Sequence, residues 1–228
     1  MKTKLTAKKY TKKLRKSVFK IGIQKNGILT KMSLSYIQRS LKTKCKRYEH
    51  ADKVLSNWIS TLKGITSIHF IRNSDLAPLV ANGLLDIAIV GTDMIEETKL
   101  DNRISKVKNI GKDLWGLYYM TAHDRPVKLK DAKVIGTPYP RIAKKILRET
   151  GNHKAHILKV DGSSELLPWL KMGDLEIDGV LDISVSGKTA ANNGLCRMGQ
   201  PYRLFKSVLI ANSLSLKDKS KTYFFERL

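Results

Sequence analysis

The stretch IDGVLDISVSGKTAANNGL, residues 177–195, joins an apolar strand-like run to a turn of small residues and then to a helix-like segment. We predict a strand over 178–185, a turn over Ser186–Thr189 and a helix after it. A strand, a glycine-bearing turn and a helix form the repeating unit of α/β folds, which bind ligands beyond the carboxyl ends of their strands. The stretch therefore predicts both the fold class and the place of a binding site.

The core Gly187-Lys188-Thr189 matches the end of a nucleotide-binding P-loop, GxxxxGK[ST]. That motif requires a second glycine at position 182, where this chain has Asp182. No glycine lies between Gly179 and Gly187. The sequence therefore argues against a triphosphate-binding P-loop.

The same residues suit a single phosphate group. The turn offers backbone N–H groups, the hydroxyls of Ser186 and Thr189 and the Lys188 ammonium at a helix N-terminus, a combination that binds a phosphate monoester. Asp182, at the end of the strand, is placed to accept hydrogen bonds from vicinal hydroxyls. Together they fit a ribose 5-phosphate. An ordinary capped helix after a strand remains open as the alternative on this segment alone.

Strand-like and helix-like runs alternate along the chain, which is typical of parallel sheets covered by helices. We predict an α/β fold of two lobes, with a ligand-binding cleft between two mixed or parallel sheets. The predicted strands are 18–24, 67–72, 84–91, 114–122, 132–137, 154–160, 178–185 and 205–212. The predicted helices are 31–43, 75–83, 93–97, 141–150 and 163–171, with a tail that is helical in part.

The chain has 228 residues, enough for one large or two small α/β domains. The polar stretch ETKLDNRISK predicts a lobe boundary near residue 104, and the run 114–122 is expected to cross between lobes. We expect a basic flexible arm over 1–16. Lobe I, on the acceptor side, takes 17–104 with 198–228, and lobe II, on the donor side, takes 105–197.

The chain is strongly basic, with 43 Lys and Arg against 20 Asp and Glu, and no acidic residue precedes Glu49. Steering of anionic substrates, nucleic-acid binding and a simple bias toward lysine all fit this balance. Aromatic residues make up only 7% and form no stacking platform, which disfavours a nucleic-acid partner.

Several features predict a cytoplasmic protein that does not enter a membrane. No apolar run approaches the roughly 20 residues of a membrane span, and no secretory signal is evident. The two cysteines, Cys45 and Cys196, fit neither a disulfide framework nor a zinc site. His153 and His156 stand three residues apart without a third ligand, so we expect them at a solvated edge.

Several segments, in order, resemble the catalytic subunit of ATP phosphoribosyltransferase. The segments that carry the resemblance are QKNGIL (24–29), IRNSDLAPLVANGLLDIAIVGTDMIEE (71–97), IGTPYPRIAKKIL (135–147), DGSSELLP (161–168) and IDGVLDISVSGKTAANNGL (177–195). The last two are specific, and the others support them.

This resemblance implies two α/β lobes of the periplasmic-binding-protein kind. It implies a pentosyltransferase, a type of glycosyltransferase, that moves phosphoribosyl from 5-phosphoribosyl 1-diphosphate to N1 of ATP, the first step of histidine biosynthesis. Magnesium is expected on the substrate phosphates, without a dedicated protein cage. Because the sequence stops at Leu228, it looks like the short form of the family, a homodimer within a hetero-oligomer that includes a regulatory subunit resembling histidyl-tRNA synthetase.

The resemblance also assigns candidate site residues. The expected catalytic residues are Asp182, Asp178 and Glu165. The expected donor-binding residues are Ser186, Gly187, Lys188 and Thr189. The expected acceptor-binding residues are Lys25, Gly27, Arg72, Asp93 and Tyr139. Helix capping by Asp93 and by Asp75, and turn formation at Tyr139, remain open as structural roles.

Three departures from the family pattern concern mainly the acceptor. Ile28 stands where the family has an arginine that meets substrate phosphates. The region 46–58 lacks the second arginine motif, where Lys53 offers only a point charge. The segment 169–178 carries about four extra residues. A different heterocyclic acceptor, or a non-catalytic ligand-binding or regulatory paralogue, therefore stays open.

Overall fold

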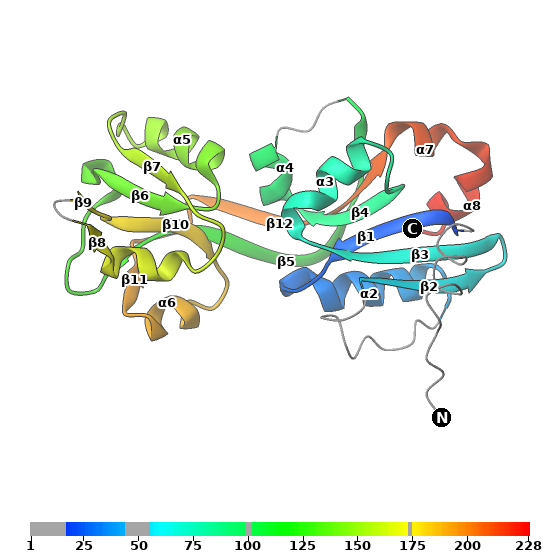
Figure 1. Ribbon diagram of the computed structural model, residues 1–228, viewed down its shortest axis with the longest axis horizontal. Helices are drawn as coiled ribbons and strands as arrows, with labels where there is room; N and C mark the ends of the chain where they lie inside the picture. The colour runs from blue at the N-terminus through cyan, green and yellow to red at the C-terminus, as the bar shows by residue number, and fades with distance from the viewer. Residues whose placement is uncertain (1–16, 44–54, 99–101, 173–174) are drawn as a thin grey trace. The chain divides into compact units, whose positions relative to one another are not determined.

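The computed structural model describes residues 17–43, 55–98, 102–172 and 175–228, and the chain divides into two compact units (Figure 1). Unit 1 comprises the described residues up to Lys112 together with Ser207–Leu228, and unit 2 comprises Asp113–Lys206. The division falls inside two long strands, β5 (Ile104–Ala122) and β12 (Arg203–Asn212), which both continue from one unit into the other. The expected basic arm, Cys45 and Lys53 lie outside the described residues.

Unit 1 is a mixed sheet in the order β2-β3-β1-β4-β12. Its strands are β1 (Ser17–Gln24), β2 (Ser56–Thr61), β3 (Gly64–Ile71) and β4 (Ile87–Gly91), with the end of β12. Its helices are α2 (Ile28–Ser40), α3 (Asn73–Ala81), α4 (Thr92–Thr98), α7 (Ser213–Lys217), the 3-10 turn η3 (Lys219–Lys221) and α8 (Thr222–Phe225). Strand β1 pairs in parallel with both β3 and β4, whereas β2 and β12 run antiparallel to their neighbours.

Unit 2 has the strand order β5-β10-β6-β7, and β11 pairs with β5 off this path. Its strands are β6 (Val134–Thr137), β7 (His156–Lys159), β10 (Gly179–Ser184) and β11 (Leu195–Arg197), with a small hairpin of β8 (Lys171–Met172) and β9 (Leu175–Glu176). Its helices are η1 (Leu129–Asp131), α5 (Pro140–Glu149), the 3-10 helix η2 (Ser164–Trp169) and α6 (Lys188–Asn192). Strands β10, β6 and β7 are parallel, so their carboxyl ends share one edge.

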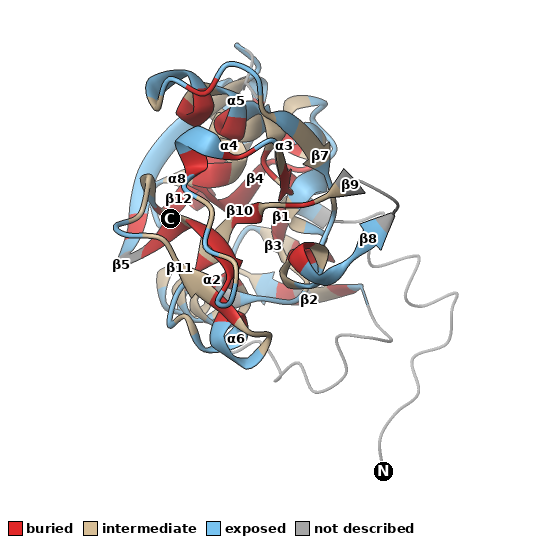
Figure 2. Cartoon of the chain, turned by 90° about the vertical axis from the view of Figure 1, so that its left-hand side faces the viewer, coloured by how far each residue is buried: buried red, intermediate tan, exposed pale blue. Residues whose placement is uncertain are grey.

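Helices cover the central strands of each unit, and Figure 2 shows buried segments both on strands such as β4 and on helices such as α5. All five residues of β4 are buried, as expected for a central strand covered on both faces. In unit 1, Phe19 of β1 stacks on Phe224 of α8 with ring centroids 4.5 Å apart, so the C-terminal helix is part of the core. The continuous apolar runs in the sequence follow from this double coverage.

A buried carboxylate ties the C-terminal segment of unit 1 to its sheet. Asp86 is 5% exposed and accepts hydrogen bonds from the Lys20 backbone N–H at 2.7 Å, the Ser215 hydroxyl at 2.6 Å and the Lys221 ammonium at 2.8 Å. These partners come from β1, α7 and η3. One side chain therefore joins three segments that are far apart in the sequence.

The order of the predicted elements is confirmed, but several boundaries and types differ. Strand β5 begins at Ile104 and not at 114, and strands β2, β8, β9 and β11 were not predicted. The segment predicted as a helix over 163–171 is a 3-10 helix over Ser164–Trp169, followed by the short strand β8. Within the described residues, Arg72 is the N-cap of α3 and no side chain caps it, so the predicted capping by Asp75 is wrong.

We expect Asp86→Ala to lower the free energy of unfolding by about 2–3 kcal/mol, because it leaves buried hydrogen-bonding groups without their acceptor. Urea denaturation followed by circular dichroism measures this loss. The control is Asp75→Ala, since Asp75 is exposed and bonds the neighbouring Ser74 hydroxyl at 3.1 Å. That variant is expected to change stability by less than about 0.5 kcal/mol. Equal losses in the two variants would contradict a structural role for Asp86.

Candidate functional site

Asp182 lies near the carboxyl end of β10, and its carboxylate is tied on both oxygens. Oδ2 accepts a hydrogen bond from the Ser164 hydroxyl, and Oδ1 accepts one from the Ile183 backbone N–H at 2.6 Å. Burial raises the pKa of Asp182, the two hydrogen bonds offset part of that rise, and the nearby charge of Glu165 adds to it. A perturbed carboxyl held this firmly at a strand end is typical of a functional site.

The segment that supplies Ser164 and Glu165 begins in a strained turn. Ser163 has a φ of 49° in the left-handed region, which a residue other than glycine rarely adopts. Ser164 is fully buried, and Glu165 lies half-buried in the first turn of η2. The bond from Ser164 to Asp182 anchors this turn. Because Glu165 follows Ser164 and its charge raises the pKa of Asp182, the predicted residues Asp182 and Glu165 lie close together.

The four donor-loop residues follow β10 directly. Gly187 has a φ of 75° and precedes α6, where the first helical bond runs from the Ala191 N–H to the Gly187 carbonyl at 2.9 Å. The helix itself offers no acceptor to the N–H groups of Thr189 and Ala190. The Ser186 hydroxyl accepts from the Lys188 N–H at 3.3 Å and so stiffens the turn. Ser186, Lys188 and Thr189 are all exposed.

Arg197 stands beside this loop and was not singled out from the sequence. Its guanidinium donates to the Ser184 hydroxyl at 2.8 and 3.2 Å and lies 4.1 Å from the centre of the Tyr118 ring. A Cβ built on Gly187 would meet the guanidinium carbon at 3.2 Å, so the arginine packs directly against the turn. This places a fixed positive charge next to the loop.

No local sequence motif identifies Arg197 as a site residue. It lies on the three-residue strand β11, which is fixed only by antiparallel pairing with β5, where Arg197 is opposite Met120. That pairing joins residues more than seventy positions apart in the chain. Ser184, the acceptor of the guanidinium, lies in the predicted strand but carried no motif of its own.

Two other predicted residues of unit 2 have structural partners. The Asp178 carboxylate accepts the backbone N–H groups of Lys133 and Val134 at 2.6 and 2.9 Å, at the opposite end of β10 from the donor loop. The expected catalytic role of Asp178 therefore has no support in its position, since its carboxylate ties the start of β6.

Tyr139 is the N-cap of α5, and its N–H donates to Thr137 Oγ1 at 2.9 Å, which in turn donates to the Leu181 carbonyl at 2.6 Å. It thus lies in unit 2, near Asp182.

The remaining predicted residues lie together at one edge of the sheet in unit 1. Lys25 and Gly27 follow β1, Arg72 follows β3 and Asp93 follows β4. Because these three strands are parallel neighbours, their carboxyl ends meet, and the Lys25 N–H donates to the Ile71 carbonyl at 2.7 Å. Asp93 is 2% exposed inside α4, whereas Arg72 is exposed. Burial of a carboxylate to that degree is uncommon and fits a specialised role.

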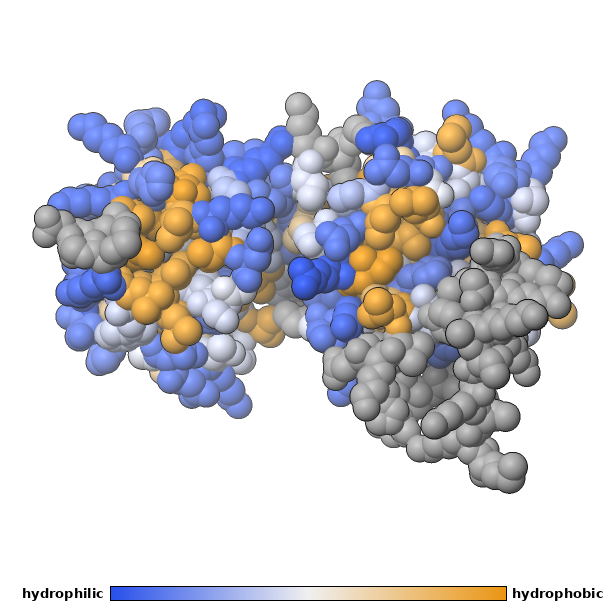
Figure 3. Space-filling view, in the orientation of Figure 1, coloured by the Kyte–Doolittle hydropathy of each residue, from blue (hydrophilic) through white to orange (hydrophobic). Residues whose placement is uncertain are grey.

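An apolar surface borders the site in unit 2. Leu166, Trp169 and Leu170, on η2 and just after it, are 41–58% exposed. Figure 3 shows a hydrophobic patch over this part of the unit. The Trp169 indole N–H donates to the Asn193 carbonyl at 2.8 Å and so ties η2 to the end of α6. The two segments that carry the site are therefore joined a second time.

Residues 72–228 match the HisG family model, described as ATP phosphoribosyltransferase. An ATP phosphoribosyltransferase of Hydrogenobaculum sp. strain Y04AAS1 is 29% identical over 91% of this chain and 96% of its own length. One of Listeria welshimeri is 32% identical over 70% of this chain and 71% of its own length.

Solved structures give the same architecture. An ATP phosphoribosyl transferase (HisG:HisZ) complex from Thermotoga maritima has a TM-score of 0.69 at 20% identity, over 92% of this chain and 96% of that chain. Truncated arginine-bound ArgBP from the same organism has a TM-score of 0.55 at 13% identity, over 96% and 95%. The prediction of an α/β fold of the periplasmic-binding-protein kind is confirmed.

We expect Asp182→Asn to raise the urea midpoint at pH 8. The folded-state pKa of Asp182 lies above its ordinary value, so the ionised carboxylate costs stability at a pH above the folded-state pKa. That cost disappears below the ordinary aspartate value of about 3.9, so the gain shrinks as pH falls toward 4. Urea titrations at several pH values measure the trend.

Asp178→Asn, just before the same strand, is the matched control, since it weakens two charge-assisted bonds to backbone N–H groups. It is expected to lower the midpoint at pH 8. An Asp182→Asn midpoint below that of the unchanged protein at pH 8 would contradict the assigned desolvation cost.

Proposed function

Because this chain belongs to the ATP phosphoribosyltransferase family and is a transferase by that relationship, we propose that it moves 5-phosphoribosyl from 5-phosphoribosyl 1-diphosphate to N1 of ATP. This makes it a pentosyltransferase acting at the first step of histidine biosynthesis. The observation that carries the proposal is the pairing of Asp182 with Ser164 beside the exposed loop Ser186–Thr189. That arrangement offers one carboxylate to a diol and several donors to one phosphate.

The donor's 5-phosphate would lie on the loop, where the Thr189 and Ala190 N–H groups and the two hydroxyls donate to it. Arg197 would act on the same phosphate through its charge and by holding Ser184 and the turn at Gly187. Asp182 would accept hydrogen bonds from the ribose hydroxyls. Fixed donors and acceptors of this kind position the anomeric carbon for attack.

Displacement at that carbon passes through an oxocarbenium-like state, which carries positive charge. The carboxylates of Asp182 and Glu165 lie close enough to interact, so both would stabilise this charge. A magnesium ion carried by the diphosphate would supply charge neutralisation to the leaving group. Asp182 and Glu165 supply oxygen donors, which suit the water shell of a substrate-bound Mg²⁺.

The acceptor would meet the residues at the sheet edge of unit 1, namely Lys25, Gly27, Arg72 and Asp93. Lys25 and Arg72 supply the positive charge that the ATP phosphates need, and Asp93 supplies a carboxylate. Ile28 at the start of α2 brings no charge, unlike the family's arginine. This one residue favours a second candidate function, the same donor with a different heterocyclic acceptor.

A partner and a location complete the proposal. The Thermotoga maritima neighbour is a HisG:HisZ complex, so we propose that this chain also joins a HisZ-type regulatory subunit, as a homodimer within a hetero-oligomer. We propose a cytoplasmic location, where both substrates are made. Among the described residues, no helix is both long and apolar enough to cross a bilayer.

We expect the protein to bind 5-phosphoribosyl 1-diphosphate with magnesium in isothermal titration calorimetry, with a HisZ-type subunit present in a parallel series. Asp182→Ala and Thr189→Ala should weaken binding at least tenfold, because each removes a hydrogen bond to a charged or polyhydroxyl ligand. Arg197→Met should also weaken donor binding at least tenfold. Arg197→Lys should recover part of the affinity, because lysine keeps the charge but cannot donate two hydrogen bonds from a planar guanidinium.

Lys133→Ala, an exposed charge change just before β6 at the opposite end of the strands from the donor loop, is the control and should alter affinity by less than about twofold. Absence of donor binding in both series would remove the enzyme proposal. Unchanged affinity in both Asp182→Ala and Thr189→Ala would show that the donor binds elsewhere.

We expect ATP to serve as the acceptor. Donor, magnesium, ATP and inorganic pyrophosphatase are mixed with the protein, and the absorbance of phosphoribosyl-ATP is followed. Pyrophosphatase draws the reaction forward by removing the product. Donor binding without product, with the HisZ-type partner supplied, would contradict ATP as the acceptor and favour another heterocycle.

A further inference from the structure

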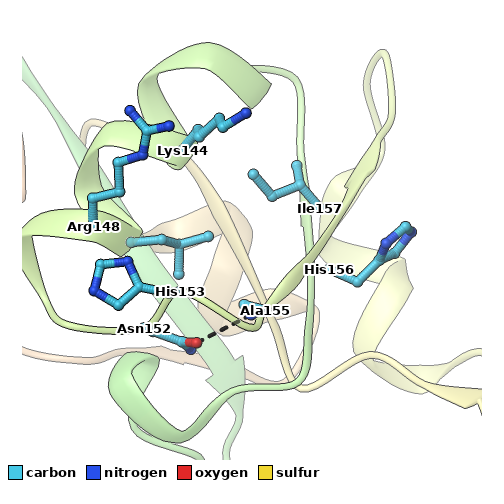
Figure 4. A pocket seen from close by; sticks show the side chains of 8 residues that line it. Lys144, Arg148, Asn152, His153, Ala155, His156 and Ile157 are labelled. Atoms are coloured by element: carbon cyan, nitrogen blue, oxygen red, sulfur yellow. Dashed lines mark hydrogen bonds between the residues drawn. The ribbon is translucent and has the colours of Figure 1, made fainter.

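Unit 2 contains a basic pocket on the side of α5 that is separate from the donor loop. It has a volume of about 430 Å³ and lies between α5 and the start of β7. Figure 4 shows Lys144 and Arg148 on α5 and His153 below Arg148, whereas the ring of His156, on β7, is turned away from these three side chains. The floor is apolar, from Leu147, Ala155 and Ile157. A volume in this range is typical of small-molecule sites, and five of its eight lining residues are polar or charged.

The charges of this pocket are not compensated within the protein. Among the described residues, no acidic side chain lines it. Lys144 and Arg148 are four residues apart on one helix face, where two like charges destabilise the helix. Neither has an ion-pair partner in the described part of the chain, whereas Glu149 next to them is already paired with Arg203. A bound anion would relieve this repulsion.

The pocket is held by a rigid turn. Asn152, 7% exposed, donates to the Leu129 and Ala132 carbonyls at 2.8 Å each and accepts from the Lys154 and Ala155 N–H groups at 3.3 and 3.1 Å. Its amide therefore fixes the backbone of the connection between α5 and β7, which carries His153. The backbone at His153 is thus set before any ligand arrives, which lowers the ordering cost of binding.

Strand register places the pocket at the opposite edge of the sheet from the donor loop. His156 opens β7 and is paired with Val134 at the start of β6, whose neighbour in β10 is the segment at Gly179. The donor loop follows Ser184, at the other end of β10. Since β10, β6 and β7 are parallel, the two sites lie at opposite ends of the same strands.

We propose that this pocket is a second anion site, which binds the phosphate group of a small phosphorylated metabolite. Arg148 and Lys144 would donate charge-assisted hydrogen bonds to the phosphate oxygens, with the imidazole of His153 as a further donor. The apolar floor would take the non-ionic part of the ligand. The inference does not rest on the proposed transferase activity, because it uses none of the donor or acceptor residues.

The experiment uses the imidazole signals of the full-length protein as local reporters. Histidine is labelled with ¹³C, and the signals are assigned with His153→Gln and His156→Gln. Inorganic phosphate is then titrated at constant ionic strength, with sodium chloride making up the balance. The signal of His153 should shift with saturation, while that of His69, in β3 of unit 1, should stay in place.

A double variant and a matched control decide the assignment. Lys144→Ala with Arg148→Ala should weaken phosphate binding at least tenfold. Lys128→Ala with Lys130→Ala removes the same charge from exposed positions of unit 2 outside the pocket, and should change it by less than about twofold. All four positions are exposed, so the variants are expected to fold, which a two-dimensional amide spectrum checks.

Three outcomes would overturn the proposal. These are shifts that do not saturate, shifts that chloride alone reproduces, and affinity that is unchanged in the Lys144→Ala, Arg148→Ala double variant. Failure of the donor titration leaves this result untouched, because the reporters lie at the other edge of the sheet. The two proposals therefore fail separately.

Discussion

The hydrogen bond from Ser164 to Asp182 joins the two sequence segments that make the candidate site. One segment enters through the left-handed backbone of Ser163, and the other leaves β10 into the donor loop. Burial of the Asp182 carboxylate raises its pKa, so the fold bears the cost of a desolvated acid at this point. A site that binds ribose hydroxyls needs such an acceptor already fixed, and the strain at Ser163 is the local expense of fixing it.

What could be predicted from the sequence follows from periodicity and turn chemistry. The apolar runs that became β1, β4 and β10, and the Gly-bearing turn after β10, are local features, so their positions were predictable. Arg197 was not, because its place depends on pairing between β11 and β5 across a long stretch of chain. Asp178 and Asp182 look equivalent in the sequence, four residues apart on one strand. Only the hydrogen bonds of the folded chain show that Asp178 binds the start of β6 while Asp182 binds η2.

Parallel pairing explains why residues from distant motifs gather at edges. In unit 1, the ends of β1, β3 and β4 bring Lys25, Arg72 and Asp93 to one edge of the sheet, although the three residues are far apart in the sequence. The same geometry brings Thr137 of β6 against Leu181 of β10 in unit 2. The sequence could therefore predict the set of residues at each edge. It could not predict burial, which separates the fully enclosed Asp93 from the exposed Arg72.

The basic balance of the chain has a local as well as a global meaning. A formal charge of +23 attracts any anion and speeds encounter without selecting one. Selection of one anion requires cations at defined positions that no acidic side chain neutralises. Unit 2 has such cations at both ends of its strands. Arg197 is held by Ser184 and Tyr118, and the Lys144–Arg148 pair is set on a helix above a turn that Asn152 fixes. Because opposite edges of one sheet carry these groups, two anions can be bound together without competing for a residue.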